Sequence, residues 1–279
     1  MRKLGLIAGG GNLPVEIAQH CDRSGRPLFV IRLKGFAGPN LAPFAGAEVG
    51  IAELGKCFRA LRRAGCEAVC LAGNVSRPDF AALIPDLRGL AALPAVIAAA
   101  GKGDDALLRT ILAEFEKEGF AVEGAQEVMG DLALPMGLLG RHAPTEEQLG
   151  DVARAMQVAR AIGDLDIGQA AAVCRGLVLA VEAAEGTDAM LARVSGLPQA
   201  VRGRPGASAG VLAKARKPIQ ETRVDLPTIG PATVRAAVHA GLAGIVGEAG
   251  GLLVLEREAV IQLADDLGVF ILGVESPSS

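Results

Sequence analysis

Short apolar runs alternate with amphipathic segments along the first half of the chain, and this alternation limits the fold more than any other feature of the sequence. The run at residues 3–8 is typical of a buried strand, and the segment after it is typical of a helix with Pro14 at its first position. Strands and helices are expected in alternation at 3–8, 14–24, 27–33, 54–64, 67–74 and 104–117. Such alternation favours a parallel sheet with helices on both faces.

The second half resumes the alternation after a break rich in glycine and proline. Thr145 is followed three residues later by Gln148, a capping-box pattern that begins a new helix. Further elements are expected at 145–162, 176–186, 187–194, 210–215, 231–239, 243–250, 252–256, 257–266 and 268–275. We therefore predict an α/β protein of two α/β domains, an N-terminal Rossmann-like domain with a parallel sheet at 1–135 and a C-terminal α/β domain at 136–279.

Composition excludes several classes of protein. Mean hydropathy is +0.37, but the most apolar stretch, residues 89–100, is interrupted by Pro94 and is shorter than the roughly 20 residues of a membrane span. The N-terminus has no apolar core of signal-peptide length, so we expect a cytoplasmic protein and leave open peripheral contact with a membrane. The net charge of −3 and the lack of Trp and Tyr argue against a nucleic-acid partner. Five cysteines without zinc-site spacing indicate buried thiols.

A glycine loop follows the first expected strand and opens into a helix. Backbone N–H groups at such a junction suit phosphate, so Gly10, Gly11 and Asn12 are candidate binding residues. A dinucleotide fingerprint that starts at Gly9 would place its third glycine on Pro14, and the second strand ends in basic rather than acidic residues. We predict a generic phosphate or nucleotide cradle. A tight turn that needs glycine for its backbone is the structural alternative.

Carboxylates gather at three expected helix starts. Asp104 and Asp105 follow Lys102, Glu182 and Glu185 precede Thr187 and Asp188, and Gln220 precedes Asp225. Each group is compatible with ordinary helix capping. Loops after the carboxyl ends of strands share one crevice in α/β domains, and converging carboxylates there favour Mg²⁺, with Mn²⁺ as the alternative. Basic residues such as Lys214 would neutralise phosphate oxygens.

The motifs GLIAGGGNLP, LAGNVSRP, GKGDDALLR, VEAAEGTDAML and KPIQETRVDLPTIGPATV resemble one family over essentially the whole chain. This family is the UDP-2,3-diacylglucosamine pyrophosphatases of lipid A biosynthesis that are unrelated to the calcineurin-like metallophosphoesterases. The resemblance implies Mg²⁺-assisted hydrolysis of the pyrophosphate bond of UDP-2,3-diacylglucosamine to lipid X (2,3-diacylglucosamine 1-phosphate) and UMP. It also implies an active site in the cleft between two domains, a nucleotide-linked glycolipid as the ligand, and a homodimer, with contact at the inner membrane left open.

The resemblance also assigns roles to residues. Asp225 matches the family's essential acid, and the expected catalytic residues are Asp225, Asp104, Asp105, Glu185, Thr187 and Asp188. The expected metal ligands are Asp225, Asp104 and Asp188, and the expected substrate-binding residues are Gly10, Gly11, Asn12, Gly73, Asn74, Lys102, Glu182, Lys214 and Gln220. Two alternatives remain at this point: an NADP-dependent oxidoreductase, and a non-catalytic binder of nucleotide-lipids.

Overall fold

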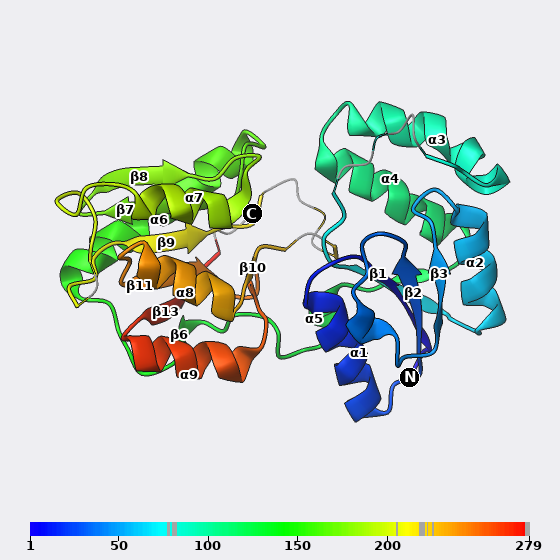
Figure 1. Cartoon of the computed structure of the whole chain (residues 1–279), viewed down its shortest axis with the longest axis horizontal. Helices are drawn as coiled ribbons and strands as arrows, with labels where there is room; N and C mark the ends of the chain where they lie inside the picture. Colours follow the sequence, from blue (N-terminus) through cyan, green and yellow to red (C-terminus); the bar gives the residue numbers. More distant parts are fainter. Residues whose placement is uncertain are drawn as a thin grey trace. The chain divides into compact units, whose positions relative to one another are not determined.

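The chain divides into two compact α/β units, drawn in Figure 1, and each is described here by itself. The computed structural model describes residues 1–76, 79, 83–204, 206–217, 221, 223–224 and 226–276. Unit 1 comprises Met1–Asp131 and Glu221–Asp225, and unit 2 comprises Leu132–Gln220 and Leu226–Ser279. The predicted fold class, α/β with a parallel sheet in the first half and a second α/β arrangement, is confirmed.

Unit 1 is built on a parallel sheet of five strands in the order β3-β2-β1-β4-β5. The strands are β1 (Leu4–Ala8), β2 (Leu28–Leu33), β3 (Gly46–Val49), β4 (Ala68–Ala72) and β5 (Ala121–Val122). Leu4 of β1 pairs with Leu28 of β2 on one side and with Ala68 of β4 on the other. Because β1 is central and covered on both faces, every residue of it is buried, which explains its unbroken apolar sequence.

Helices cover both faces of this sheet (Figure 1). They are α1 (Leu13–Ser24), α2 (Leu54–Arg63), α3 (Leu87–Ala100), α4 (Asp104–Lys117) and α5 (Ala125–Val128), with a short 3-10 turn at Pro39–Leu41. On one face, Phe58 of α2, Phe115 of α4 and Phe120 pack together over Ile7 of β1. The sequence analysis assigned no element to α3, which packs mainly on α4 and α2 and keeps Pro94 inside the helix.

Unit 2 holds a mixed sheet of six strands in the order β6-β13-β11-β9-β7-β8. The strands are β6 (Gly137–Leu138), β7 (Ala170–Cys174), β8 (Leu177–Val181), β9 (Val211–Lys214), β11 (Gly244–Glu248) and β13 (Phe270–Val274), and β10 (Thr228–Ile229) pairs separately with β12 (Leu253–Val254). The central strands β9, β11 and β13 are parallel, whereas β6 and β7 pair antiparallel to their neighbours. Strand β7 is rich in alanine, which weakened its signal in the sequence.

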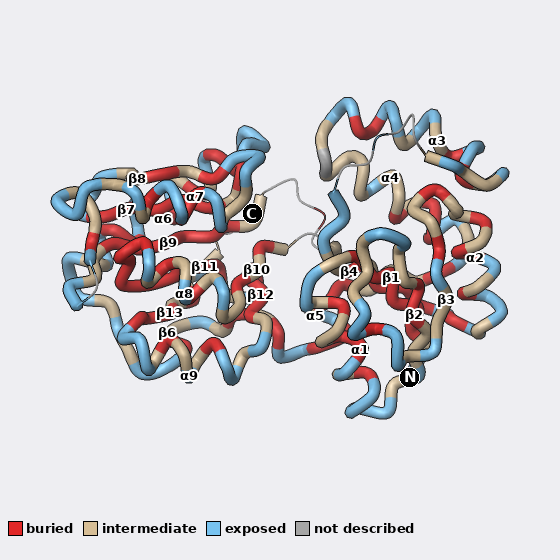
Figure 2. The backbone as a smooth tube through the Cα atoms, viewed as in Figure 1, coloured by how far each residue is buried: buried red, intermediate tan, exposed pale blue. Residues whose placement is uncertain are grey.

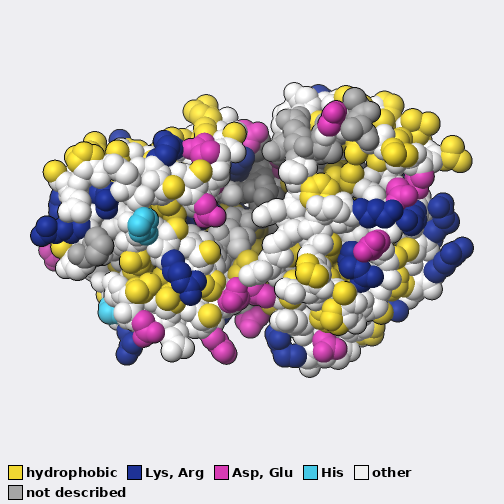
Figure 3. Space-filling model, viewed as in Figure 1, with side chains coloured by type: hydrophobic (Ala, Val, Ile, Leu, Met, Phe, Trp, Pro, Cys, Tyr) yellow, Lys and Arg dark blue, Asp and Glu magenta, His cyan; other side chains and the backbone are white. Residues whose placement is uncertain are grey.

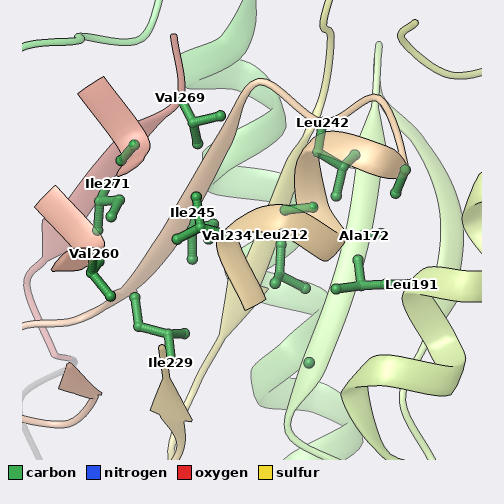
Figure 4. Close-up of a cluster of buried hydrophobic side chains, with 14 of the residues drawn as sticks. Ala172, Leu191, Leu212, Ile229, Val234, Leu242, Ile245, Val260, Val269 and Ile271 are labelled. Atoms are coloured by element: carbon green, nitrogen blue, oxygen red, sulfur yellow. The ribbon is translucent and has the colours of Figure 1, made fainter. Parts of the chain in front are cut away.

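Four helices pack on the second sheet: α6 (Glu146–Asp164), α7 (Gly186–Ser195), α8 (Pro231–His239) and α9 (Arg257–Leu267). Leu212, Val234, Ile245 and Val260 belong to a core that strands share with α7, α8 and α9 (Figure 4). Helix α6 packs on β7 and β9 through a separate buried cluster. The predicted capping box begins α6, because the Thr145 N–H donates to Gln148 Oε1 at 2.9 Å and the Gln148 N–H donates to Thr145 Oγ1 at 3.3 Å.

Strand β1 of unit 1 and strands β7, β9 and β11 of unit 2 are buried along their whole length, as Figure 2 illustrates, whereas edge strands such as β3 and β8 are partly exposed. Within the described ranges, no helix combines the length and the hydrophobicity that crossing a bilayer would require.

Candidate functional site

The two glycine loops that follow β1 and β4 bind directly to each other. The Gly10 N–H donates to the Asn74 carbonyl oxygen at 2.8 Å, and the Asn74 N–H donates back to the Gly10 carbonyl oxygen at 2.8 Å. A Cβ atom on Gly73 would lie 2.5 Å from the Gly10 carbonyl oxygen, and Gly73 itself has a φ of +93°. Glycine is therefore required here for close approach of two backbones as well as for turn geometry.

These loops occupy the position at which open α/β sheets bind ligands. Strands β1 and β4 are neighbours in the sheet, and the chain leaves them in opposite directions along the strand order, which creates a crevice at their carboxyl ends. Gly11, at a φ of +86°, and Asn12 lead from this crevice into α1, and both are exposed. The structure thus brings together Gly10, Gly11 and Asn12 with Gly73 and Asn74, which the sequence analysis predicted as substrate-binding residues from two separate motifs.

A cavity of about 560 Å³ opens beside the paired loops within unit 1. Its polar lining comes from Glu53, Asn74 and Ser76, together with Gly9 and Gly73 of the paired loops. The apolar part comes from strand ends and from the three helices α2, α3 and α4: Ile7, Leu33, Val49, Leu54, Leu71, Ala92, Leu93, Val96, Leu107, Leu108, Ile111 and Phe115. Its volume lies in the range of pockets that bind small molecules, and its apolar lining suits hydrocarbon.

Asp105, near the start of α4, anchors a segment that is distant in the sequence. Its Oδ1 accepts the N–H of Glu221 at 2.7 Å, and its Oδ2 accepts the Nε–H of Arg109 at 2.7 Å. Arg223 extends the connection by donating to both oxygens of Glu221, at 2.9 and 3.0 Å, and to Glu116 at 2.7 Å. Glu221 and Arg223, which precede the predicted essential acid in the sequence, are thereby fastened to α4.

Charges in this cluster stabilise one another. Hydrogen bonds from Arg223 lower the pKa of the Glu221 carboxyl below its ordinary value, and the Asp105 carboxylate raises the pKa of the Arg109 guanidinium. Both shifts favour the ionised forms, so the contact of Glu221 and Arg223 with α4 is strongest when Glu221 is deprotonated.

A second polar cluster lies at one end of the sheet of unit 2. Glu182 follows β8 and is buried; its Oε1 accepts from the Thr187 hydroxyl at 2.7 Å, and its Oε2 accepts from the Gln169 N–H at 3.1 Å. The Glu182 N–H donates to the Ala170 carbonyl oxygen, and Ala170 pairs across the ladder with Lys214, whose Nζ donates to the Thr228 carbonyl oxygen at 3.0 Å. Glu182 and Thr187, predicted from one motif, are thus joined by a hydrogen bond, and Lys214, predicted from another segment, lies at the same end of the sheet.

The other predicted residues of this unit lie on its surface. Glu185 precedes α7 and forms an ion pair with Arg193, and hydrogen bonds to its carboxylate lower its pKa. Asp188 is exposed in the first turn of α7. Within the described residues, neither side chain forms a hydrogen bond with the buried carboxylate of Glu182.

The sequence analysis did not identify the buried carboxylate of Glu248, at the end of β11. Its Oε1 accepts from Arg160 Nε at 2.9 Å, and Arg216 approaches Oε2 at 3.5 Å. Glu248 and Glu182 share one signal: each ends an apolar strand and is followed by alanine. A search for charged residues that end apolar runs would have found both acids, and it would also have found Lys214 at the end of β9.

Three predicted residues are described in part or not at all. Asp225 and Gln220 lie outside the described residues, and for Asp104 the helix position is described without its side chain. Lys102 is exposed between α3 and α4. Among the side chains that the structure describes, no three acids, histidines or cysteines group as a metal site would. Asp105 and Glu182 each use both carboxylate oxygens for protein donors.

Comparison with known proteins covers nearly the entire chain. Residues 3–132 match the family described as the LpxI N-terminal domain, and residues 135–272 match the LpxI C-terminal domain. The UDP-2,3-diacylglucosamine pyrophosphatase LpxI of Caulobacter vibrioides is 66% identical over 275 residues, which cover 99% of this chain and 98% of that protein. Among solved structures, a CobK precorrin-6A reductase is 15% identical, and the comparison covers 100% of this chain and 89% of the reductase chain. Its TM-score of 0.28 is too low to support an argument.

Proposed function

Since the chain belongs to the LpxI family of UDP-2,3-diacylglucosamine pyrophosphatases and is a hydrolase, we propose that it hydrolyses UDP-2,3-diacylglucosamine in lipid A biosynthesis, releasing UMP and lipid X. The observation that carries the proposal is the 66% identity with the Caulobacter vibrioides enzyme along nearly the full length of both chains. No observation favours the oxidoreductase or the non-catalytic binder over this hydrolase.

The substrate has two chemically different ends, and unit 1 offers surroundings suited to each. Acyl chains require an apolar cavity, and the cavity between α3, α4 and the sheet has that lining. The paired loops at Gly10 and Asn74 stand at its polar side, at the carboxyl ends of β1 and β4. We propose that these loops face the nucleotide or diphosphate part of the substrate while the cavity receives hydrocarbon.

Hydrolysis of a pyrophosphate requires that negative charge on the transferred phosphoryl group be spread and that a water molecule be held in line. We propose that Asp225 orients this water or binds the metal ion. The contacts that fasten Glu221 and Arg223 to α4 support this role, because they restrict the backbone next to Asp225. Lys214, buried beside Thr228, and Thr187 are proposed to contact the diphosphate or the residues around it.

We propose that Mg²⁺ assists, with Mn²⁺ as a substitute. Magnesium is usually held by one or two carboxylates together with substrate phosphates and water, so a site of few acids is sufficient. Asp105 and Glu182 already accept two hydrogen bonds each, which favours Asp225, Asp104 and Asp188 as the proposed ligands. When bound, the ion would neutralise charge on the diphosphate.

The decisive experiment measures UMP release from UDP-2,3-diacylglucosamine by the wild-type protein and by Asp225→Ala and Asp225→Asn, with Mg²⁺ and with EDTA. We expect release that requires both Mg²⁺ and the Asp225 carboxylate, with a loss of about a hundredfold or more in either variant. Exposed Asp188→Asn provides a test of the proposed ligand set. Equal rates in the Asp225 variants would exclude this residue from the chemistry, and tight substrate binding without UMP release would support the non-catalytic binder.

Two further features stay predictions. We propose that the enzyme acts in the cytoplasm, at the inner face of the membrane that holds its lipid substrate, and that it forms a homodimer, as the family resemblance implies. Sedimentation velocity across a range of concentrations tests the dimer.

A further inference from the structure

The outer face of α3 is apolar and exposed. Leu87 is 88% exposed, Leu90 56% and Ile97 47%, and Ile84, just before the helix, is 87% exposed. Ala91, Pro94 and Ala95 are also exposed, and from Leu90 to Ala98, more than two turns, the helix carries no polar side chain. Single exposed aliphatic residues are common, but a continuous helical stripe of them marks an interaction surface.

The opposite face of α3 belongs to the cavity of unit 1. Ala92, Leu93 and Val96 line that cavity, so the helix separates it from the exterior surface. A helix that is apolar on both sides lacks the polar face of an ordinary surface helix. Packing on α4 and α2 explains only the inner face.

Basic side chains surround this apolar surface. Helices α2 and α3 together carry five basic residues, Lys56, Arg59, Arg62, Arg63 and Arg88. Three of them pair with neighbouring acids: Lys56 with Glu53, Arg62 with Glu118, and Arg88 with Glu114 and Glu118. Arg59 and Arg63 are exposed, and neither is in an ion pair with a described residue. The two helices are joined by Asp86, the N-cap of α3, whose carboxylate accepts N–H groups from Gly89 of α3 and from Gly55 and Lys56 of α2. Figure 3 shows the hydrophobic side chains over α3 and the Lys and Arg side chains over α2 beside them.

We infer that α3 and the basic surface of α2 form a docking surface for a bilayer that contains anionic phospholipids. Leucine and isoleucine side chains on one helix with arginines alongside match the requirements of an interfacial site: apolar groups enter the boundary of the acyl region, and guanidinium groups remain among the phosphates. The exposed guanidinium groups of Arg59 and Arg63, which have no acid in an ion pair within the described residues, favour an anionic surface over an uncharged protein partner. The inference deepens the proposed function and rests on it for its purpose, since a two-chain lipid substrate resides in such a bilayer and α3 also borders the apolar cavity.

The test uses the full chain and vesicles without substrate. Flotation with vesicles of phosphatidylethanolamine and phosphatidylglycerol is compared with flotation with phosphatidylcholine vesicles. Three proteins are tested: the wild type, the triple variant Leu87→Gln, Leu90→Gln, Ile97→Gln, and the double variant Arg59→Gln, Arg63→Gln. We expect wild-type binding to anionic vesicles, a loss of about tenfold or more in the triple variant, and loss of the preference for anionic lipid in the arginine variant. The matched control, Leu165→Gln with Leu177→Gln, changes leucines of unit 2 that are 71% and 52% exposed and should bind as the wild type does.

Several outcomes would overturn the inference. Equal vesicle binding by the wild type and the triple variant, or no binding to anionic vesicles, would exclude the α3 surface as a bilayer site. Loss of self-association in the triple variant would instead assign this surface to a second copy of the chain. Circular dichroism and the melting temperature establish that each variant is folded. Hydrolysis of substrate in detergent micelles separates the two proposals: vesicle binding without UMP release contradicts the enzymatic function alone, whereas UMP release without vesicle binding contradicts the docking surface alone.

Discussion

At the scale of single residues, the half-buried carboxylate of Asp105 and the buried carboxylates of Glu182 and Glu248 organise the protein's own backbone and guanidinium groups. Asp105 accepts from Glu221 and Arg109, Glu182 accepts from Gln169 and Thr187, and Glu248 faces two arginines. A buried carboxylate is costly unless donors surround it, so these partners account for the burial. The sequence analysis expected acids to gather around a cation. For Asp105 and Glu182 the described contacts favour a role in positioning the segments that carry other proposed site residues.

The Glu221 carboxylate should make the attachment of Glu221 and Arg223 to α4 dependent on pH. Its pKa in the folded protein is lowered by hydrogen bonds from Arg223, so its contribution to stability is complete above the ordinary value of 4.5 and is lost as the pH falls through the lowered value. We expect the hydrogen-exchange protection of the Glu221 amide to fall between pH 5 and about pH 3 in the wild type.

Glu221→Gln should weaken this protection at neutral pH and remove the pH dependence, and Arg223→Gln should have the same effect from the other side of the pair. A parallel pH dependence in wild type and Glu221→Gln would show that another group controls the attachment.

At the scale of elements, the loops after β1 and β4 stabilise the fold by binding each other and also form part of the candidate site. Gly10 and Asn74 exchange two backbone hydrogen bonds, which consumes N–H groups that a phosphate cradle would otherwise offer. Pro14 lacks an N–H and lies in the first turn of α1. The glycines are therefore explained in large part by the mutual packing of the loops, while the exposed turn at Gly11 and Asn12 remains the part accessible to a ligand.

Gly73→Ala should disrupt this pair of loops. The new Cβ would lie 2.5 Å from the Gly10 carbonyl oxygen and 2.7 Å from Pro14 Cγ, at a φ of +93° that favours glycine. We expect a loss of about 2 kcal/mol in the free energy of unfolding and weaker substrate binding, measured by urea denaturation and by KM.

Gly38→Ala is the matched control in the same unit. Gly38 has a φ of −76° and open space around its Cα, so the substitution should be neutral or stabilise the protein by a few tenths of a kcal/mol. If both variants lose the same stability, close approach of the loops is not the cause.

At the scale of the whole molecule, each unit buries an apolar core of its own and no cysteine is left at the surface. All five cysteines, Cys21, Cys57, Cys66, Cys70 and Cys174, are unpaired and buried. Burial raises the pKa of the Cys57 and Cys70 thiols to about 12, whereas nearby charges have smaller effects. Because the thiolate is the reactive species, these two cysteines are protected both by exclusion of reagents and by their protonation.

We therefore expect Ellman's reagent at pH 8 to react with none of the five thiols within minutes in the folded protein and with all five in denaturant. At that pH a thiol of pKa about 12 is ionised in about one molecule in ten thousand. Fast reaction of Cys57 or Cys70 in the folded protein would show that unit 1 opens far more often than its packing indicates.

Hydrophobic periodicity, turn residues and helix caps determined the α/β class, most strands and the starts of helices such as α4, α6 and α8, because these depend on neighbours within a few residues. The alanine-rich strand β7 and the apolar helix α3 lacked a clear period, and only their packing partners decided their state. The motifs also contained both glycine loops and the Glu182 cluster. Their pairing across β1 and β4, the anchoring of Glu221 on Asp105 and the burial of Glu248 were decided by tertiary structure, since each joins residues that lie far apart along the chain.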